Sequence, residues 1–399
     1  MSQDSFRELG VSAPVVDALA KLSITTPFQI QTRVVPDALA GLDVLAKSPT
    51  GSGKTLAFAI PIVEHLDANA ATPAALVLVP TRELAAQVAE ALAGIAAAKG
   101  LRVAAVYGGV SIPEQGKRAG WAHVLVATPG RLEDITSRRL VRRDGVRILV
   151  LDEADRMLDM GFQPQVDRIV RRLPRERQTM FFSATLDGEV GRIADAYTRD
   201  ARLHEADLPT SRERGEVEHR FVSVTADNKV EKLVELLAAE RGLALVFVRT
   251  KHGADRLVKK LDRVGVTALA MHGDKTQAVR ERALSRFESG KVSTLVATDV
   301  AARGLDLDEI THVINFDPPA EGKDYIHRVG RTGRAGRDGT GITLVLPEQQ
   351  ADVSRVAARL GHVEQFAREG MAVAPARLIY SSNRGRGSKW GPPRQRRKV

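Results

Sequence analysis

The chain has 399 residues, which is long enough for two domains of common size, each with its own hydrophobic core. It contains no cysteine and no apolar run near the roughly 18 residues of a membrane span, so disulfides and thiolate catalysis are excluded and we expect a cytoplasmic protein. The formal net charge is +10, yet residues 371–399 carry eight Lys or Arg and no Asp or Glu, so the first 370 residues are nearly balanced.

In the first half of the chain, short apolar runs alternate with segments of helical length and spacing. The segment 82–100 is one of the helices expected between these runs. Such alternation is typical of an α/β domain built on a mainly parallel sheet. The runs that predict strands are 43–47, 74–81, 102–109, 123–130, 147–155 and 178–185.

The second half has the same organisation without being a sequence repeat of the first. Between the halves, the stretch from His204 to Glu218 is polar and lacks a long apolar run. The expected strands of the second half are 218–225, 243–250, 266–273, 293–300, 312–317 and 341–347. We therefore predict a first domain over 1–205, a linker over 206–216, a second domain over 217–370 and a tail over 371–399.

The segment SPTGSGKT, which begins at Ser48, is similar to a phosphate-binding P-loop, although Ser48 stands where the general pattern has glycine. Gly51 and Gly53 can adopt positive φ and let backbone N–H groups converge on phosphate oxygens. Lys54 would then reach the outer phosphates and the Thr55 hydroxyl would bind Mg²⁺. A flexible Gly/Ser turn is the alternative, but the strand before the segment and the helix after it favour a nucleotide site.

Two carboxylates, Asp152 and Glu153, follow the apolar run of LVLDEAD about a hundred residues after this loop. One carboxylate can hold Mg²⁺, usually through water, while its neighbour positions or deprotonates the attacking water. A solvated acidic turn is the alternative. The pairing of a phosphate-binding loop with a metal carboxylate favours phosphoryl transfer.

A basic, glycine-rich segment, HRVGRTGRAGR, begins at His327 in the second half. Arg331 and Arg334 are three residues apart, so on a helical turn they share a face. Guanidinium groups placed beside a γ-phosphate stabilise the charge of the transferring group. The alternative is a flexible basic loop that only touches nucleic acid.

The tail is rich in Gly, Pro and Ser and has no apolar periodicity, so we expect it to be disordered. Its eight basic residues are interleaved with Tyr380 and Trp390, a composition that suits nucleic-acid backbones and unstacked bases. A solubilising tail is the alternative.

The motifs taken together resemble those of the DEAD-box ATP-dependent RNA helicases of superfamily 2, in a compact bacterial-type core with a basic tail. The resemblance runs from about Phe6 to about Leu360, and it depends on ten motifs in the right order rather than on any one. It implies two tandem RecA-like α/β domains with ATP and RNA bound at the cleft between them. In chain order the motifs are TPFQIQ, SPTGSGKT, PTREL, YGG, TPGR, DEAD, SAT, LVFVRT, ATDVAARGLD and HRVGRTGR.

The resemblance also implies roles for individual residues at an ATP and Mg²⁺ site. Gln31 would read the adenine edge, Phe6 would stack on the base, and Asp306 would contact the ribose. Thr55 and Asp152 would bind Mg²⁺, partly through water, Glu153 would act on the attacking water, and Arg331 and Arg334 would be arginine fingers. The phosphates would be held by Thr50, Gly51, Ser52, Gly53, Lys54 and Thr55.

Further roles implied by the resemblance concern RNA. Ser183, Thr185 and His327 would couple the ATP site to the RNA site. RNA, as single strands or short duplexes, would be contacted mainly through phosphates and 2′-hydroxyls. The residues expected to make these contacts are Arg82, Gly109, Thr128, Arg131, Gly273 and Thr298.

The adenine motif departs from the family pattern, which usually reads Gly-aromatic-x-x-Pro-Thr-Pro-Ile-Gln. This chain has Ser23 for the glycine, Ile24 for the aromatic residue, Phe28 for the threonine and Gln29 for the second proline. Because Gln31 is present, we expect a preference for adenine. The threonine hydroxyl of the family pattern is missing here, and the loop is expected to be less rigid, so adenine selectivity is a less firm expectation than hydrolysis.

The mechanism that the resemblance implies is a clamp in which ATP and RNA together close the two domains. Backbone contacts in a bent shape would open a short duplex locally without reading its sequence. Two alternatives stay open: an ATP-gated RNA clamp or assembly scaffold that unwinds little, and a DNA-directed superfamily 2 helicase. The chain has no long heptad pattern, so a monomer is expected.

Overall fold

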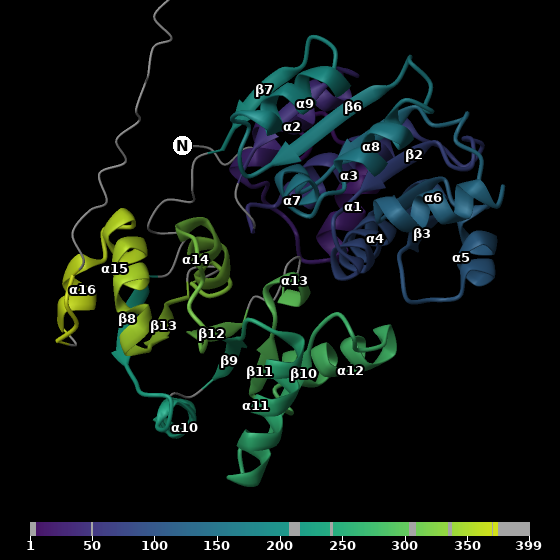
Figure 1. Ribbon diagram of the computed structural model, residues 1–399. Helices are drawn as coiled ribbons and strands as arrows, with labels where there is room; N and C mark the ends of the chain where they lie inside the picture. Colours follow the sequence, from purple (N-terminus) through teal and green to yellow (C-terminus); the bar gives the residue numbers. More distant parts are fainter. Residues whose placement is uncertain are drawn as a thin grey trace, which may run out of the picture.

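Two separate parallel sheets, each flanked by helices, form the framework of the chain in the computed structural model (Figure 1). The predicted fold class of two α/β units is thereby confirmed. The residues that the structure describes are 5–48, 51–206, 216–239, 242–302, 309–333, 337–368 and 370–373.

The first sheet has seven parallel strands, and its central strands are continuous apolar runs buried on both faces, as expected for a parallel sheet covered by helices. The strands in spatial order are β3 (Val103–Val106), β4 (Val124–Ala127), β2 (Ala75–Leu78), β5 (Ile148–Leu151), β6 (Gln178–Ser183), β1 (Val44–Lys47) and β7 (Arg202–Glu205).

Helices cover both faces of this sheet and separate two apolar core clusters, one on each side. The helix α4 begins at a short polar residue, because the Thr81 hydroxyl accepts a hydrogen bond from the Leu84 backbone N at 3.2 Å. The helices are α1 (Ala13–Lys21), α2 (Gln29–Leu39), α3 (Lys54–His65), α4 (Arg82–Ala96), α5 (Ile112–Ala119), α6 (Pro129–Ser137), α7 (Ala154–Asp159), α8 (Gln163–Val170) and α9 (Glu189–Tyr197), with a 3₁₀ turn at Ala97–Lys99.

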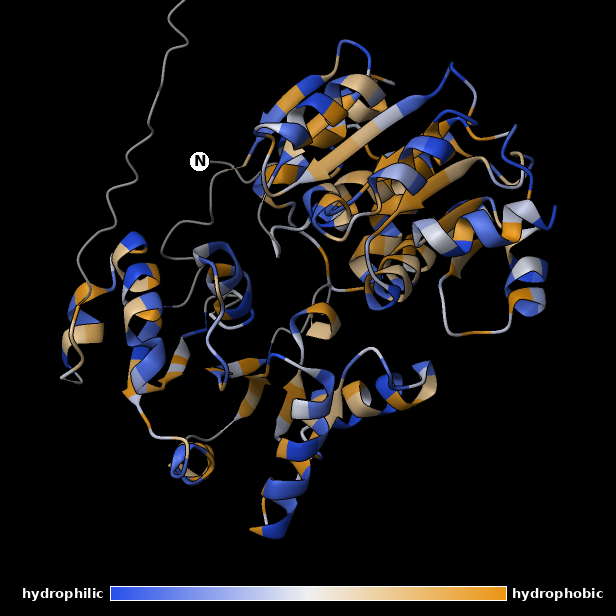
Figure 2. Cartoon of the chain, viewed as in Figure 1, coloured by the Kyte–Doolittle hydropathy of each residue, from blue (hydrophilic) through white to orange (hydrophobic). Residues whose placement is uncertain are grey.

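The second sheet has six parallel strands, again between two core clusters. Figure 2 shows the apolar residues gathered on strands and inner helix faces of both halves. The strands in spatial order are β10 (Ala268–Met271), β11 (Thr294–Ala297), β9 (Leu243–Phe247), β12 (Ile310–Asn315), β13 (Gly339–Val345) and β8 (Val217–Ser223). The helices are α10 (Lys229–Ala239), α11 (Lys251–Arg263), α12 (Gln277–Glu288), α13 (Asp299–Ala302), α14 (Gly322–Val329), α15 (Gln350–Arg359) and α16 (Val363–Arg368), with a 3₁₀ turn at Pro347–Gln349.

One strand, β7, was not predicted. Its sequence, Arg-Leu-His-Glu, is mostly exposed, because β7 lies at the edge of the first sheet and pairs only with β1. The register places Glu205 opposite Lys47, and the Ala206 backbone N donates to the Lys47 carbonyl at 3.0 Å. The last strand of the first half therefore ends beside the last residue of β1.

The first sheet ends at Glu205 and the second begins at Val217, on either side of the predicted linker, most of which lies outside the described residues. The predicted tail lies outside them from residue 374 onward. Within the part of the chain that the structure describes, no helix is both long enough and apolar enough to cross a bilayer.

Candidate active site and nucleic-acid interface

The P-loop between β1 and α3 is the centre of the candidate site. Gly51 and Gly53 have φ of 79° and 84°, a region that L side chains rarely adopt. Lys54 begins α3, and its Nζ donates to the Ser48 carbonyl at 2.8 Å. Burial lowers the pKa of Lys54, although the carboxylates that follow β5 oppose this shift. Thr55 follows in the first turn of the helix, and Thr50 lies outside the described residues.

Ser48, the departure from the general P-loop pattern, ties the loop to the neighbouring strand. Its backbone N donates to the Ser183 carbonyl at 2.9 Å, at the end of β6, and its hydroxyl contacts the Ser52 hydroxyl. Ser48 is 1% exposed. A serine here therefore adds a polar contact within the loop, which a glycine would not provide.

Asp152 and Glu153 lie where β5 ends and α7 begins, and both are buried. Asp152 Oδ1 accepts a hydrogen bond from the Glu153 backbone N at 2.9 Å, and Glu153 has a left-handed φ of 52°. Burial raises the pKa of Asp152 to about 6, and the nearby Lys54 ammonium opposes that rise. The structure thus brings Lys54 and both carboxylates together, as the sequence predicted.

Arg156, one turn further along α7, is a partner of Glu153 that the sequence reasoning missed. Its Nη1 lies 2.7 Å from Glu153 Oε2, and both side chains are less than a tenth exposed. Burial alone would raise the pKa of Glu153, but the cations Arg156, Lys54 and Arg331 together hold it below its ordinary value. Glu153 is therefore kept ionised. The spacing of three residues on a helix was the available signal.

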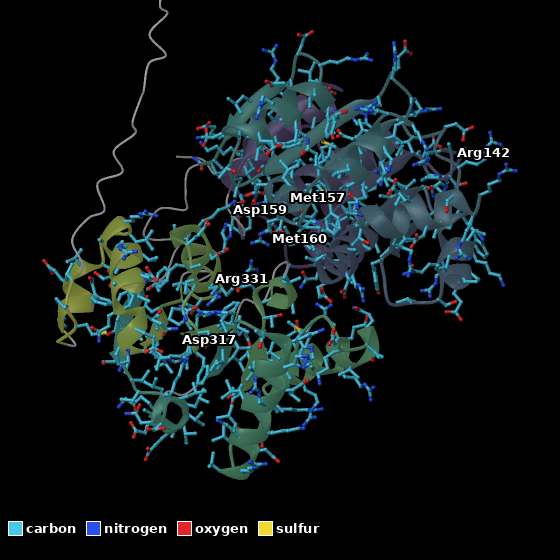
Figure 3. The ribbon with its side chains drawn as sticks, viewed as in Figure 1. Arg142, Met157, Asp159, Met160, Asp317 and Arg331 are labelled. Atoms are coloured by element: carbon cyan, nitrogen blue, oxygen red, sulfur yellow. The ribbon has the colours of Figure 1, made fainter. Side chains whose placement is uncertain are left out.

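Arg331 reaches this cluster from the second half of the chain. It lies just after α14, is 4% exposed, and its charge is one of those that lower the pKa of Glu153. Figure 3 shows Arg331 between the two halves, on the side that faces Asp159 of α7. Nearby, Lys323 Nζ lies 2.9 Å from Asp159 Oδ2. Arg334 and Asp306 lie outside the described residues.

Arg328, in the same motif, fixes α14, the helix that directly precedes Arg331, and the sequence reasoning gave it no role. Its guanidinium binds Asp299 at 2.7 Å, the Asn315 side chain at 3.0 Å and the Asp317 carbonyl at 2.7 Å. These partners belong to α13, β12 and the loop after β12. Arg328 is 5% exposed, so these contacts anchor α14 to the sheet beneath it.

At the adenine motif, Gln31 is fully buried in the first turn of α2. Its Oε1 accepts from the Phe28 backbone N at 2.9 Å, and its Nε2 donates to the Gly53 carbonyl at 2.9 Å. Gln31 therefore joins α2 to the P-loop. Its role toward adenine stays a prediction.

Two phenylalanines near this motif differ sharply in exposure. Phe6 is 2% exposed and packs in the core, whereas Phe28 is 57% exposed. The Phe28 ring occupies the space that a Cβ at Gly53 would need, 2.7 Å from its position. The aromatic surface open to solvent beside the P-loop is thus that of Phe28, and stacking of Phe6 on adenine stays a prediction.

The predicted coupling residues are divided between the two halves of the chain. Ser183 is fully buried at the end of β6, and its hydroxyl accepts a hydrogen bond from the Thr185 backbone N at 3.3 Å. His327 is on α14; burial lowers its pKa, and the Arg156 cation lowers it further. His327 is therefore a neutral side chain near α7 at neutral pH.

The predicted RNA residues of the first half gather at the carboxyl ends of neighbouring strands. The Arg82 guanidinium lies against Gly109, where a Cβ would overlap it, and Gly109 has a φ of 86°. Thr128 precedes α6, and Arg131 Nη1 donates to the Val110 carbonyl at 2.9 Å and to Gln115 Oε1 at 2.6 Å. The edge that these residues share is where open α/β sheets bind ligands.

In the second half, Gly273 and Thr298 follow β10 and β11 in the same way. A Cβ at Gly273 would meet no atom within 4 Å, so the backbone there is accessible. The Thr298 carbonyl accepts hydrogen bonds from the Ala301 and Ala302 backbone N atoms at 3.0 Å, which starts α13. In Figure 1, α12, α13 and α14 lie on the side of the second half that faces the first.

A buried ion pair joins the two halves beside the RNA residues, and no local pattern in the sequence pointed to it. Arg280 Nη2 of α12 lies 2.9 Å from Glu83 Oε1 of α4, an ion pair rather than a hydrogen bond, and the side chains are 7% and 4% exposed. Each charge of such a pair requires the other, because a single buried charge without a counter-charge destabilises the arrangement.

We expect Glu83→Gln to weaken the closed arrangement of the halves, since Arg280 would stay buried without its counter-charge. Breaking a buried pair costs about 3 kcal/mol, so the ATP-induced gain in RNA affinity should fall about a hundredfold. RNA affinity measured with and without nucleotide checks this. Glu133→Gln, which removes the partly exposed partner of Arg168 within the first half, is the control. An unchanged nucleotide effect on RNA affinity would mean that the pair does not stabilise closure.

Two family models match the chain. The model described as DEAD/DEAH box helicase matches residues 28–193, and the model described as Helicase conserved C-terminal domain matches residues 228–336. Along its length the chain is 40% identical over 374 residues to a DEAD-box ATP-dependent RNA helicase, CshA, of Geobacillus kaustophilus, covering 92% of this chain and 77% of that protein.

The chain belongs to the DEAD-box ATP-dependent RNA helicases. It is also 41% identical to the CshA of Listeria monocytogenes over 350 residues, which cover 86% of this chain and 66% of that protein. The resemblance that the motifs indicated is therefore confirmed across most of the chain.

Solved structures agree with this DEAD-box assignment. The structure of S. cerevisiae Dbp5 bound to RNA and ADP BeF3 has a TM-score of 0.76 at 30% identity, over 92% of this chain and 94% of that one. A DEAD box protein from Methanococcus jannaschii gives 0.53 at 35% identity, over 90% and 97%.

Proposed function

We propose that this DEAD-box protein is an RNA-stimulated ATPase that grips RNA through its backbone and locally unwinds short duplexes or remodels RNA–protein complexes. The observation that carries the proposal is the approach of Arg331, from the second half, to the buried Glu153 of the first. An arrangement of this kind lets one event, closure of the halves, complete both the nucleotide site and the RNA-binding edge.

The residues around the P-loop fit a nucleotide with Mg²⁺. A Cβ at Gly51 would meet no atom within 4 Å, so the loop has open space beside it, and a buried ammonium faces two buried carboxylates. Mg²⁺ prefers carboxylate and hydroxyl oxygens, which Asp152 and Thr55 provide. Bound ATP with Mg²⁺ would supply the phosphoryl group that is transferred to water.

Four side chains of the chain would each have a separate role in hydrolysis. Lys54 would neutralise phosphate charge, and Asp152 would hold the cation in place. Glu153, kept ionised by the cations around it, would accept a proton from the attacking water. Arg331 would stabilise charge on the transferring group only when the second half is docked, which links turnover to closure.

RNA would lie along the edge formed by Arg82, Gly109 and Arg131 in the first half and by Gly273 and Thr298 in the second. Guanidinium and backbone groups at such positions contact phosphates and carry little sequence information. We infer that the protein tolerates many RNA sequences. A cytoplasmic location, a monomeric state and Mg²⁺ as the metal form part of the same proposal, and they depend on the residue patterns described above.

Strand displacement tests the proposal most directly. With ATP, the full chain should release the strands of a short RNA duplex, and the rate of ATP hydrolysis should rise with RNA much more than with DNA of the same sequence, because 2′-hydroxyl contacts distinguish the two. ATP hydrolysis stimulated by RNA without strand release would favour the alternative of an ATP-gated clamp. Equal stimulation by DNA would contradict the RNA specificity.

Truncating the chain after residue 370 should flatten the salt dependence of RNA binding, because the tail carries eight basic residues and no acidic one. Each phosphate neutralised on a single strand contributes a slope of about −0.7 in log affinity against log salt, so about five contacts correspond to about 3.5. ATP turnover at saturating RNA should barely change. RNA affinity measured over a salt series checks this, and an unchanged slope would assign the tail to solubility or to protein binding.

A further inference from the structure

A groove of about 500 Å³ lies on the first half, along the edge strand β3 and beneath α5. Its floor is apolar, formed by Val103, Ala104 and Ala105, and none of the roles discussed above uses it. Edge strands carry unpaired backbone groups on one side, so a groove beside one is accessible to a ligand.

The rim of this groove is positively charged. Arg102, Lys117 and Arg118 line it, and its lining contains no carboxylate. Among the described residues, neither Lys117 nor Arg118 takes part in an ion pair. Unpaired cations around an apolar floor suit a ligand that carries negative charge and has flat apolar surface.

Trp121 presents such a surface to the groove. It lines the groove and is 67% exposed, the highest exposure among the large apolar side chains that the structure describes. Its backbone is held in place, because Arg102 Nε donates to the Trp121 carbonyl at 2.8 Å. An exposed indole at a fixed position beside cations is a stacking surface for an unpaired base.

The groove is continuous with the RNA-binding edge proposed above. Val110 and Gln115 line it, and both accept hydrogen bonds from Arg131 Nη1, at 2.9 Å and 2.6 Å. Val110 directly follows Gly109 in the chain. An RNA strand bound at Gly109 and Arg131 therefore lies next to the mouth of the groove, which begins one protein residue further along, at Val110.

We propose that this groove is a second binding site for single-stranded RNA, in which a base stacks on Trp121 and phosphates pair with Arg102 and Arg118. It extends the proposed backbone grip of the core, on which it depends, to RNA that continues beyond the clamp. Because stacking and charge pairing accept any base, the site would add affinity for longer strands without adding sequence preference.

RNA length separates this site from the core. We would first find the shortest oligouridine that gives full stimulation of ATP hydrolysis, and then compare it with oligouridines lengthened at the 5′ or the 3′ end. In the full chain, Trp121→Ala should weaken binding of the longer RNA about tenfold and leave the shortest RNA unchanged. Trp121→Phe should restore most of the loss, since a phenyl ring also stacks.

Charge gives an independent readout. Arg118→Ala should flatten the salt slope for the longer RNA by about 0.7 and leave the slope for the shortest RNA unchanged. Arg263→Ala, which removes the same charge from exposed α11 in the other half, is the matched control and should change neither slope. In a Trp390→Phe background, Trp121 is the only tryptophan, and its fluorescence should be quenched by the longer RNA alone.

The failures are distinguishable. If the shortest oligouridine neither binds nor stimulates hydrolysis, the proposed function itself is wrong. If the shortest RNA behaves as expected but Trp121→Ala and Arg118→Ala change nothing for longer RNA, the groove is not an RNA site. Quenching of Trp121 by an acidic peptide such as oligoglutamate, with no response to longer RNA, would also overturn the proposal and assign the groove to a protein partner.

Discussion

Replacing Glu153 with glutamine is expected to reduce RNA-stimulated ATP hydrolysis by about 10²- to 10⁴-fold, the usual contribution of a general base. Glutamine keeps the shape of the side chain and can still accept a hydrogen bond from Arg156, so the fold and the binding of ATP should persist. The variant should therefore accumulate as a closed complex on RNA. Steady-state hydrolysis, together with the dissociation rate of RNA in the presence of ATP, measures both effects.

Two comparisons make this result specific. Lys54→Ala removes a phosphate contact and should lose ATP binding as well as hydrolysis, whereas Glu153→Gln should lose only hydrolysis. Glu176→Gln makes the same chemical change at an exposed position of the first half and should leave both intact. Turnover of Glu153→Gln close to that of the unchanged chain would show that another group acts on the water.

Arg331→Ala is expected to lower RNA-stimulated turnover by about 10³-fold or more, the range attributed to an arginine that stabilises transferring phosphoryl charge. In the absence of RNA, when the halves are not held together, ATP affinity should change little, because the residues expected to bind the phosphates belong to the first half. Equilibrium binding of a fluorescent ATP analogue and single-turnover hydrolysis separate the two quantities.

Lys323→Ala is a matched control for Arg331→Ala. Lys323 is on α14, the helix that precedes Arg331, and pairs across the halves with Asp159, but its side chain is 43% exposed and no role in the chemistry is proposed for it. Loss of the Lys323 side chain should change RNA-stimulated turnover little, because most exposed ion pairs contribute little free energy. If Arg331→Ala weakens ATP binding and leaves turnover intact, Arg331 belongs to ground-state binding.

Much of the fold could be predicted because the strands of a parallel sheet are buried on both faces and so appear as continuous apolar runs. Every run expected to be a strand overlaps one. One strand, β7, is present in the structure but was not predicted. Its sequence Arg-Leu-His-Glu has no apolar run, because this edge strand is largely exposed. Its pairing with β1 depends on a neighbour more than 150 residues away, which local pattern cannot show.

The candidate site was predictable where its chemistry sits in short motifs. Lys54, Asp152 and Glu153 could be named in advance, and the structure brings them together. The residues that hold the motifs in place were not predictable to the same degree. Arg328 binds the side chains of Asp299 and Asn315 and the Asp317 carbonyl, and Glu83 finds its partner Arg280 in the other half of the chain.

The adenine motif shows a different limit. The sequence identified Phe28 as a departure from the family pattern, but its consequence is visible only in three dimensions, where the ring fills the space next to Gly53. The burial of Phe6 likewise could not be foreseen, since an aromatic residue near a motif packs in a core as often as it contacts a ligand. The sequence gives the identity of these two phenylalanines, but the side chains packed around them are known only from the structure.

The chain leaves the first sheet directly beside the strand that leads into the nucleotide loop. Glu205 ends β7 directly beside Lys47, which ends β1 one residue before Ser48, and the two side chains lie 3.5 Å apart. A force applied along the chain at Glu205 would therefore load the β1–β7 hydrogen bonds in shear, so that they share it. The P-loop directly follows β1, so a small displacement of β1 would also displace the P-loop.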